Sequence, residues 1–181
     1  MKNICFVLLF LASIATYAQK RRTENIVVVT LDGYRWKELF TGADSFLVAN
    51  KKFVPGDSTA LLEKYGAATP QERRKMLMPF VWTTIATEGQ LYGNRTIGNN
   101  VNVKNKYWFS YPGYNEMFTG YPDTAINSND YPPNPNENVL EYINKQSAYK
   151  NKVAVFASLN ADYRILNEEK SGLFINARWG G

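Results

Sequence analysis

A run of β-branched residues that ends in Asp-Gly most limits how this chain folds. The stretch from Glu24 to Asp32 reads ENIVVVTLD, and Gly33 follows directly. A continuous apolar run of this length is typical of a strand buried on both faces of a parallel sheet. Residues 152–158 form a second run of the same kind. In parallel sheets of this type ligands bind at the carboxyl edge of the strands, where Asp32 would lie.

The remaining segments alternate between helical and extended patterns. Capping residues and apolar spacing predict helices over 57–65, from Thr69, over 76–87, over 111–119 with Gly120 as the end, from Asn134, and over 161–170. Short strands are predicted at 90–95, 107–109 and 173–177. This order predicts an α/β fold with a mainly parallel sheet flanked by helices.

The first 18 residues have the pattern of a secretory signal peptide. Lys2 precedes an apolar run, and small residues follow as far as Ala18, after which we expect cleavage. The run is shorter than the roughly 20 residues that a membrane span needs, although a retained anchor is the alternative. We therefore expect a secreted or periplasmic protein that has no membrane association after cleavage. Cys5, the single cysteine, lies in this segment, so the mature chain has no thiol or disulfide.

Residues 19–181 are long enough for one domain with a hydrophobic core. The chain ends in Asn-Ala-Arg-Trp-Gly-Gly without closing an element, so we expect it to be a truncated, amino-terminal part of a larger α/β domain. The sequence does not indicate an oligomeric state.

Charge and composition exclude several kinds of function. The net charge is +5, and the basic residues are spread along the chain with acidic residues between them. This distribution predicts a solvated surface, so we do not expect a nucleic-acid polymer as a partner. The chain has no histidine. No catalytic triad or metal site that requires histidine is therefore complete within these residues.

Asp32 and Ser110 are the candidates for chemistry. Each stands at the carboxyl end of a predicted strand, and neighbouring strand ends meet at one edge of a parallel sheet. A divalent cation held by Asp32 would lower the pKa of the Ser110 hydroxyl and activate it as a nucleophile. The N–H groups of the predicted helix after Ser110 would favour a phosphate there. The alternatives are a turn or capping carboxylate for Asp32 and an N-cap serine for Ser110.

Two stretches together resemble the alkaline phosphatase superfamily. They are IVVVTLDGYRW, which contains Asp32-Gly33, and FSYPGYNEMFTGYPD, which contains Ser110-Tyr111-Pro112 and Thr119-Gly120-Tyr121-Pro122. The resemblance is to the nucleotide pyrophosphatase/phosphodiesterase-like branch and to related secreted bacterial proteins described as phosphoglyceromutase-like, and it covers roughly residues 24–160. Tyr114 stands where the formylglycine-forming motif of the related sulfatases needs arginine, which disfavours a sulfatase.

The resemblance implies a metal-dependent phosphoesterase or phosphodiesterase that acts on a small phosphate ester. Asp32 and Ser110 would ligate a divalent metal, with two Zn²⁺ in the full-length protein, and Ser110 would attack phosphorus. An asparagine after the nucleophile helix would hold a phosphoryl oxygen, with Asn127 as the candidate and Asn129 as the reserve. The family takes its remaining Asp and His ligands from a later part of the chain, so we expect residues 1–181 alone to be inactive.

Two other functions remain open. One is a phosphoglyceromutase-like phosphotransferase, which would use the same nucleophile. The other is a non-catalytic secreted binding domain on a degenerate phosphatase-like scaffold, in which the aromatic residues 107–109 stack on a sugar or nucleoside. The alternative for those aromatic residues is packing in the core.

Overall fold

The structure is a computed structural model that describes residues 23–177, and the predicted signal peptide lies outside the described residues. By its internal contacts the chain divides into two units, residues 1–31 and residues 32–181. The second unit combines helices with a small parallel sheet, which confirms an α/β fold at a coarse level. No helix in the described part of the chain is both long enough and apolar enough to cross a membrane.

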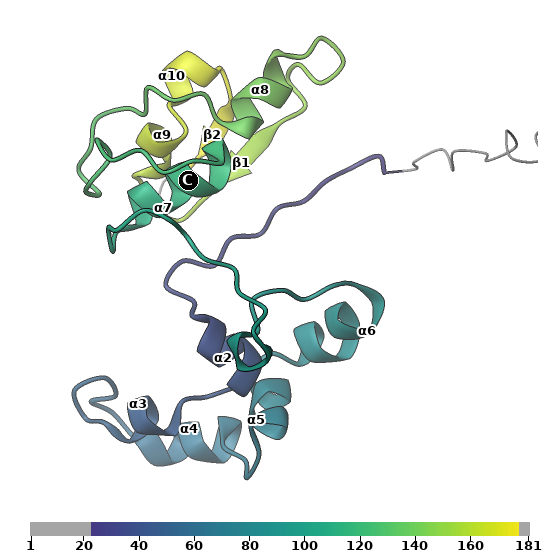
Figure 1. Ribbon diagram of the computed structural model, residues 1–181, viewed down its shortest axis with the longest axis vertical. Helices are drawn as coiled ribbons and strands as arrows, with labels where there is room; N and C mark the ends of the chain where they lie inside the picture. The colour runs from purple at the N-terminus through teal and green to yellow at the C-terminus, as the bar shows by residue number, and fades with distance from the viewer. Residues whose placement is uncertain (1–22, 178–181) are drawn as a thin grey trace, which may run out of the picture. The chain divides into compact units, whose positions relative to one another are not determined.

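Short helices make up the first part of the second unit. They are α2 (Trp36–Thr41), α3 (Ser45–Ala49), α4 (Ser58–Tyr65), α5 (Pro70–Leu77), the π-helix η1 (Val81–Ile85), α6 (Ala86–Glu88) and the 3-10 helix η2 (Arg95–Ile97), and α2 to α6 can be followed in Figure 1. Asp57 caps α4 by accepting a hydrogen bond from the Thr59 N–H, at 2.8 Å. Thr69 and Glu72 form a capping box at the start of α5. Both predicted helix starts are therefore confirmed.

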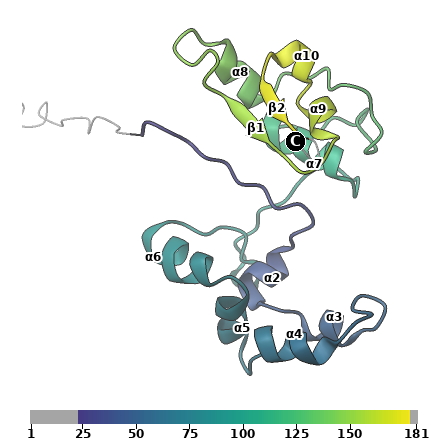
Figure 2. The same ribbon diagram turned by 180° about the vertical axis from the view of Figure 1, so that it is seen from behind.

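The second part of this unit surrounds a two-stranded sheet. Its elements are α7 (Ser110–Thr119), α8 (Val139–Lys145), β1 (Ala154–Phe156), α9 (Asp162–Ile165), α10 (Glu168–Ser171) and β2 (Phe174–Asn176). The strands are parallel, with Ala154 paired to Phe174 and Phe156 to Asn176. In Figure 1 and, from behind, in Figure 2, α7, α8, α9 and α10 lie around this strand pair. Strands are therefore confirmed within 152–158 and 173–177, but the prediction that the first is buried on both faces is wrong, since Phe156 is 74% exposed.

The hydrophobic core of this part draws on α7, the long loop after it, α9 and β2. Its buried members are Tyr111, Ile126, Ala161, Ile165, Leu166, Leu173, Ile175 and Ala177. The loop contributes Ile126, which is fully buried. Since a loop side chain lies in the core, packing as well as hydrogen bonding holds the loop in place.

Three predicted strands are absent from the described residues. Residues 24–31, 90–95 and 107–109 have no ladder partner, and the ENIVVVTLD run is extended and exposed instead. Val27 is 84% exposed. A strand requires a neighbour to which its backbone can bond, and a β-branched run indicates only that the segment suits such pairing. The prediction of a buried strand at 24–32 is therefore wrong for this structure.

The helix predicted from Asn134 begins later, at Val139. Asn138 is its N-cap and accepts a hydrogen bond from the Glu141 N–H at 2.9 Å. Asn134 is buried, and its side chain donates to Asn115 and to the Ile165 carbonyl instead. The segment has several asparagines, each able to cap, and long-range hydrogen bonds select which of them does so.

The exposed apolar run generates a prediction about solubility. We expect the double substitution Val27→Lys with Val29→Lys to raise the concentration at which the protein stays monomeric, because it places charge in an exposed β-prone segment. The free energy of unfolding should change by no more than about 0.5 kcal/mol. Size-exclusion chromatography and urea denaturation provide the two readouts. A larger loss of stability would show that these valines pack against the fold in solution.

Candidate functional site

Ser110 is the first residue of α7, and Phe109 is the N-cap. The alternative interpretation of Ser110 as an N-cap is therefore wrong, since Phe109 has the extended backbone of a cap and Ser110 is already helical. The Ser110 hydroxyl makes no hydrogen bond with any of the described residues. The helix ends as predicted at Gly120, whose backbone φ of +82° suits glycine and whose N–H donates to the Glu116 carbonyl. Ser110 is thus partly exposed, and its hydroxyl has no hydrogen-bond partner among the described residues.

An asparagine side chain occupies the amino end of α7. The Asn129 Oδ1 accepts a hydrogen bond from the Tyr111 N–H at 3.0 Å. The Asn129 Nδ2 has no partner among the described residues, so it is an available donor next to Ser110. Asn127, the candidate favoured from the sequence, is exposed and makes none of these bonds. Sequence spacing did not decide which of the two asparagines lies at the start of α7. The hydrogen bond with the Tyr111 N–H places Asn129 there.

The backbone of α7 offers an anion fewer donors than the sequence suggested. The first N–H groups of a helix lack intrahelical partners and can bind phosphate. Here the Tyr111 N–H is taken by Asn129, and Pro112 has no N–H. The donor available for an oxyanion is therefore mainly the Asn129 side-chain amide, together with the Ser110 N–H.

Tyr111 connects the loop and α9 to the start of α7. The side chain is fully buried, and its hydroxyl lies 2.7 Å from the Pro132 carbonyl and 2.9 Å from the Arg164 carbonyl. Burial raises the pKa of Tyr111 strongly, so the hydroxyl stays protonated as a donor. The Arg164 guanidinium donates to the Asn129 carbonyl at 2.9 Å. These contacts fix Asn129 on both sides, through its side chain and through its backbone.

Buried asparagines hold the rest of the loop over residues 121–138. The Asn115 Oδ1 accepts hydrogen bonds from the side-chain amides of Asn134 and Asn136, at 3.0 and 3.2 Å. The Asn136 amide also donates to Asp123 at 2.8 Å. Buried polar groups are costly unless they are paired, and these amides are paired with one another and with the backbone. The loop that carries Asn129 therefore has a defined conformation.

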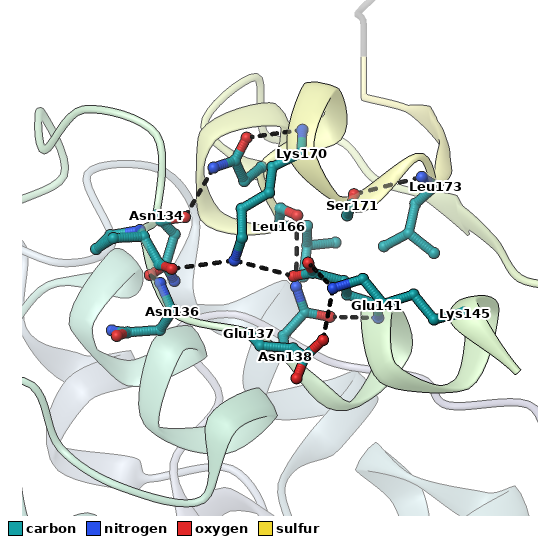
Figure 3. A network of polar contacts seen from close by, with 12 residues as sticks. Asn134, Asn136, Glu137, Asn138, Glu141, Lys145, Leu166, Lys170, Ser171 and Leu173 are labelled. Carbon is teal, nitrogen blue, oxygen red and sulfur yellow. Dashed lines mark hydrogen bonds and ion pairs between the residues drawn. The ribbon is translucent and has the colours of Figure 1, made fainter.

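Glu141 is a buried carboxylate that the structure neutralises completely. It is fully buried in α8, and it lies 2.8 Å from the Lys145 Nζ and 3.4 Å from the Lys170 Nζ. Lys170 also donates to the Pro135 carbonyl at 3.0 Å. Figure 3 shows Lys145 and Lys170 reaching Glu141 from α8 and α10. This network joins α8, α10 and the loop, and its role is structural.

Asp162 is a second buried carboxylate, and no cation accompanies it. It is the first residue of α9 and is 8% exposed. Its side chain has no hydrogen bond or ion pair among the described residues. Burial and, to a smaller extent, the negative charge of Asp32 together raise the pKa of Asp162 to about 6.

Asp32 itself is exposed and lies in a turn before α2, where Gly33 has a positive φ of +68°. The turn agrees with the Asp-Gly signal in the sequence. In the described residues no hydrogen bond links Asp32 to Ser110. Tyr111, the residue after Ser110, contacts α9 through the bond of its hydroxyl to the Arg164 carbonyl.

The described residues do not by themselves make up a metal site. Within residues 23–177, no group of three or more His, Cys, Asp or Glu side chains is arranged to hold a metal ion. Asp32 is the predicted ligand, and Asp162 is a second carboxylate, whose pKa the negative charge of Asp32 helps to raise. Carboxylate and hydroxyl oxygens are ligands for hard or borderline divalent cations. Sequence reasoning missed Asp162, because its only signal is its place a few residues after the 152–158 strand.

Comparisons with known proteins do not identify a family. No family model, no curated protein and no solved structure matches the chain.

The raised pKa of Asp162 predicts how stability depends on pH in metal-free buffer. The folded pKa of about 6 exceeds the usual value near 3.9, so the native state holds the proton more tightly than the unfolded chain. The stabilisation that the native state gains by holding this proton is complete below pH about 4. It is lost as the pH rises through about 6. We expect Asp162→Asn to flatten this dependence and to raise the free energy of unfolding at pH about 7 by up to about 3 kcal/mol. Urea denaturation across this range measures both effects, and identical pH profiles for the two proteins would contradict the burial of this charge.

Proposed function

We propose that this chain is part of a secreted, metal-dependent phosphoesterase in which Ser110 is the nucleophile. The observation that carries the proposal is the start of α7, where an uncommitted serine hydroxyl lies beside a fixed asparagine amide. A nucleophile and a donor for the developing oxyanion are the two protein groups that phosphoryl transfer needs at the reacting phosphorus, besides a cation. Asp32 supplies a carboxylate for that cation.

The proposal includes an alkaline-phosphatase-like core for the full-length protein. What supports it is the pair of motifs around Asp32 and Ser110, together with an α/β fold that has a parallel strand pair. The remaining Asp and His ligands of a two-zinc site would come from outside these 181 residues. If the complete open reading frame encodes no such Asp and His residues, the two-metal form of the proposal fails.

The chemistry proceeds by displacement at phosphorus. The Ser110 Oγ loses its proton and forms a bond to phosphorus, while the bond from phosphorus to the leaving oxygen breaks and the leaving oxygen takes up a proton. Water then hydrolyses the phosphorylated serine, which releases phosphate when the substrate is a monoester and a phosphate monoester when it is a diester. Asp32 would hold a divalent cation, which would neutralise charge on the phosphate and would lower the pKa of the serine hydroxyl. The Asn129 Nδ2 would donate to a phosphoryl oxygen, and a phosphoglyceromutase-like transferase would differ only in the group that accepts the phosphoryl.

Substitution of Ser110 tests the nucleophile against a matched control. Ser58 is also the first residue of a helix and is also partly exposed. We expect Ser110→Ala in the whole gene product to lower the rate of phosphate-ester hydrolysis by at least about a thousandfold and to remove the phosphoserine, whereas Ser58→Ala keeps both. Hydrolysis of a nitrophenyl phosphodiester in the presence of Zn²⁺ and mass spectrometry of the trapped protein are the readouts. Full activity in Ser110→Ala would exclude this nucleophile.

We expect substitution of Asn129 and of Asn127 to have different effects on the turnover rate. Asn129→Ala should reduce the turnover rate by about a hundredfold, because it removes the donor for the developing charge. Asn127→Ala should leave the rate within about twofold of the parent, since this exposed side chain bonds to nothing at the helix start. Steady-state kinetics on the same substrate compare them. A large effect of Asn127→Ala with none from Asn129→Ala would reverse the assignment.

One observation favours the non-catalytic binding domain as a second candidate. Trp108 is 98% exposed and Phe109 is 49% exposed, so these aromatic residues do not pack in the core as the alternative interpretation predicted. Exposed aromatic rings suit stacking on a sugar or nucleoside.

Fluorescence can test this second function directly. If the chain is a binding domain, a nucleoside or an oligosaccharide should quench tryptophan emission in the absence of metal, and Trp108→Ala should abolish the response. Binding of Zn²⁺ that depends on Asp32 together with no such quenching favours the enzyme.

A further inference from the structure

The strand pair of β1 and β2 leaves one edge of β1 without a partner. The Ala157 N–H, directly after β1, donates to the Asn176 carbonyl of β2 at 2.8 Å. Because the backbone groups of a strand point alternately to its two sides, those of Ala154 and Phe156 point away from β2. No third strand joins this sheet within residues 23–177. A strand edge with free N–H and carbonyl groups is a template on which another extended segment can pair.

One face of the same strand pair is apolar and exposed. The rings of Phe156 and Phe174 contact each other on this face, with their centroids 6.0 Å apart, and both side chains are exposed. Val155 and Ile175 lie on the opposite face and belong to the hydrophobic core or pack against it. Parallel sheets are ordinarily covered on both faces, so the described residues leave this sheet half covered.

Residues 24–31 are suited to the free edge of β1. The segment is extended, its side chains are exposed, and it has no ladder partner among the described residues. Its β-branched side chains suit a strand that packs beside Phe156. The described chain therefore contains an unpaired run and an unpaired edge, and it does not pair them with each other. A second copy supplies the complement of both.

The charges around the two segments are complementary. Lys150 and Lys152 lie just before β1, and Glu24 begins the exposed run. None of these three side chains forms an ion pair with a described residue. If the run pairs parallel to β1 with Val27 opposite Val155, Glu24 lies opposite Lys152. Opposite charges on facing residues stabilise such a pairing.

We propose that two copies of this chain exchange residues 24–31, so that the run of each copy adds to the free edge of β1 in the other. In this register Val28 lies beside Phe156 on the exposed face of the sheet. Val27 and Val29 lie on the opposite face, next to the core. A reciprocal exchange about a two-fold axis satisfies both runs and both edges, so the assembly closes as a dimer. This dimer would form whether or not the chain is a phosphoesterase.

Sedimentation across a concentration series tests the dimer against a matched control. We expect Val27→Lys with Val29→Lys to raise the dimer dissociation constant by at least about a hundredfold, because it places lysines where the run would be buried. Val101→Lys with Val103→Lys makes the same change at two other exposed valines, and it should leave the constant within about twofold of the parent. Both variants should keep the free energy of unfolding of the dilute, monomeric parent in urea denaturation, which shows that they fold.

Disulfide formation between two different chains tests the register. The substitution Cys5→Ser first removes the single native cysteine from both chains. After mixing, a chain with Ile26→Cys should form a disulfide with a chain that carries Ala154→Cys, because facing residues of paired strands lie within disulfide reach. Val27→Cys is also exposed but lies on the other face, so its yield with Ala154→Cys should be at least about tenfold lower. Mass spectrometry of the linked peptides measures both yields.

The exchange is supported if the parent dimerises, only the variant with lysines at 27 and 29 dissociates, and the disulfide of Ile26→Cys with Ala154→Cys joins two chains. It is overturned if the parent sediments as a monomer at every concentration, if its dimer survives those two lysines, or if both double variants dissociate it. A single chain that carries both cysteines settles the remaining case. If its disulfide closes only within monomers, the run pairs with β1 of its own chain and the exchange is overturned.

Discussion

The burial of Tyr111 is the interaction on which the second half of the structure depends. One side chain lies in the core with Ile126, Ile165 and Leu166, and its hydroxyl reaches carbonyl groups of the loop and of α9. Its backbone N–H, at the start of α7, binds Asn129. Because a buried hydroxyl without partners would be costly, the loop and α9 are constrained to bring their carbonyls to it. The position of Ser110 relative to Asn129 follows from that constraint.

The polar groups of this region fall into two classes. The buried asparagines and Glu141 are paired with amides, carbonyls or lysines, and together they give a long loop a defined conformation. The Ser110 hydroxyl, the Asn129 Nδ2 and the Asp162 carboxylate have no partner among the described residues. Because Ser110 and Asn129 are partly exposed, their free hydroxyl and amide are accessible to a ligand. A nucleophile, a donor and an anionic group form a combination suited to phosphoryl transfer with a cation.

Local signals predicted the local structure, and long-range pairing decided the rest. The cap at Asp57 and the capping box at Thr69 depend on residues three positions apart or fewer, so the sequence contains all the information that they need. The run ENIVVVTLD suits a strand equally well, but a strand needs a partner from elsewhere, and the described residues provide none. The same reasoning applies at Asn129 and Asp162. The spacing of residues does not reveal that a loop amide reaches the Tyr111 N–H, or that an aspartate at the start of α9 is buried. Candidate residues can be predicted from the sequence, whereas the residues that they contact can be identified only from the folded structure.

Amide hydrogen exchange at Tyr111 tests most directly whether the start of α7 is a preformed site. The first N–H groups of a helix ordinarily exchange quickly, because they have no intrahelical partner. The bond from the Tyr111 N–H to Asn129 predicts that this amide is protected in the parent protein and that Asn129→Ala increases its exchange rate by at least about tenfold, while amides in the middle of α7 keep their rates. Fast exchange at Tyr111 in the parent, or protection that survives Asn129→Ala, would contradict the placement of Asn129 beside Ser110.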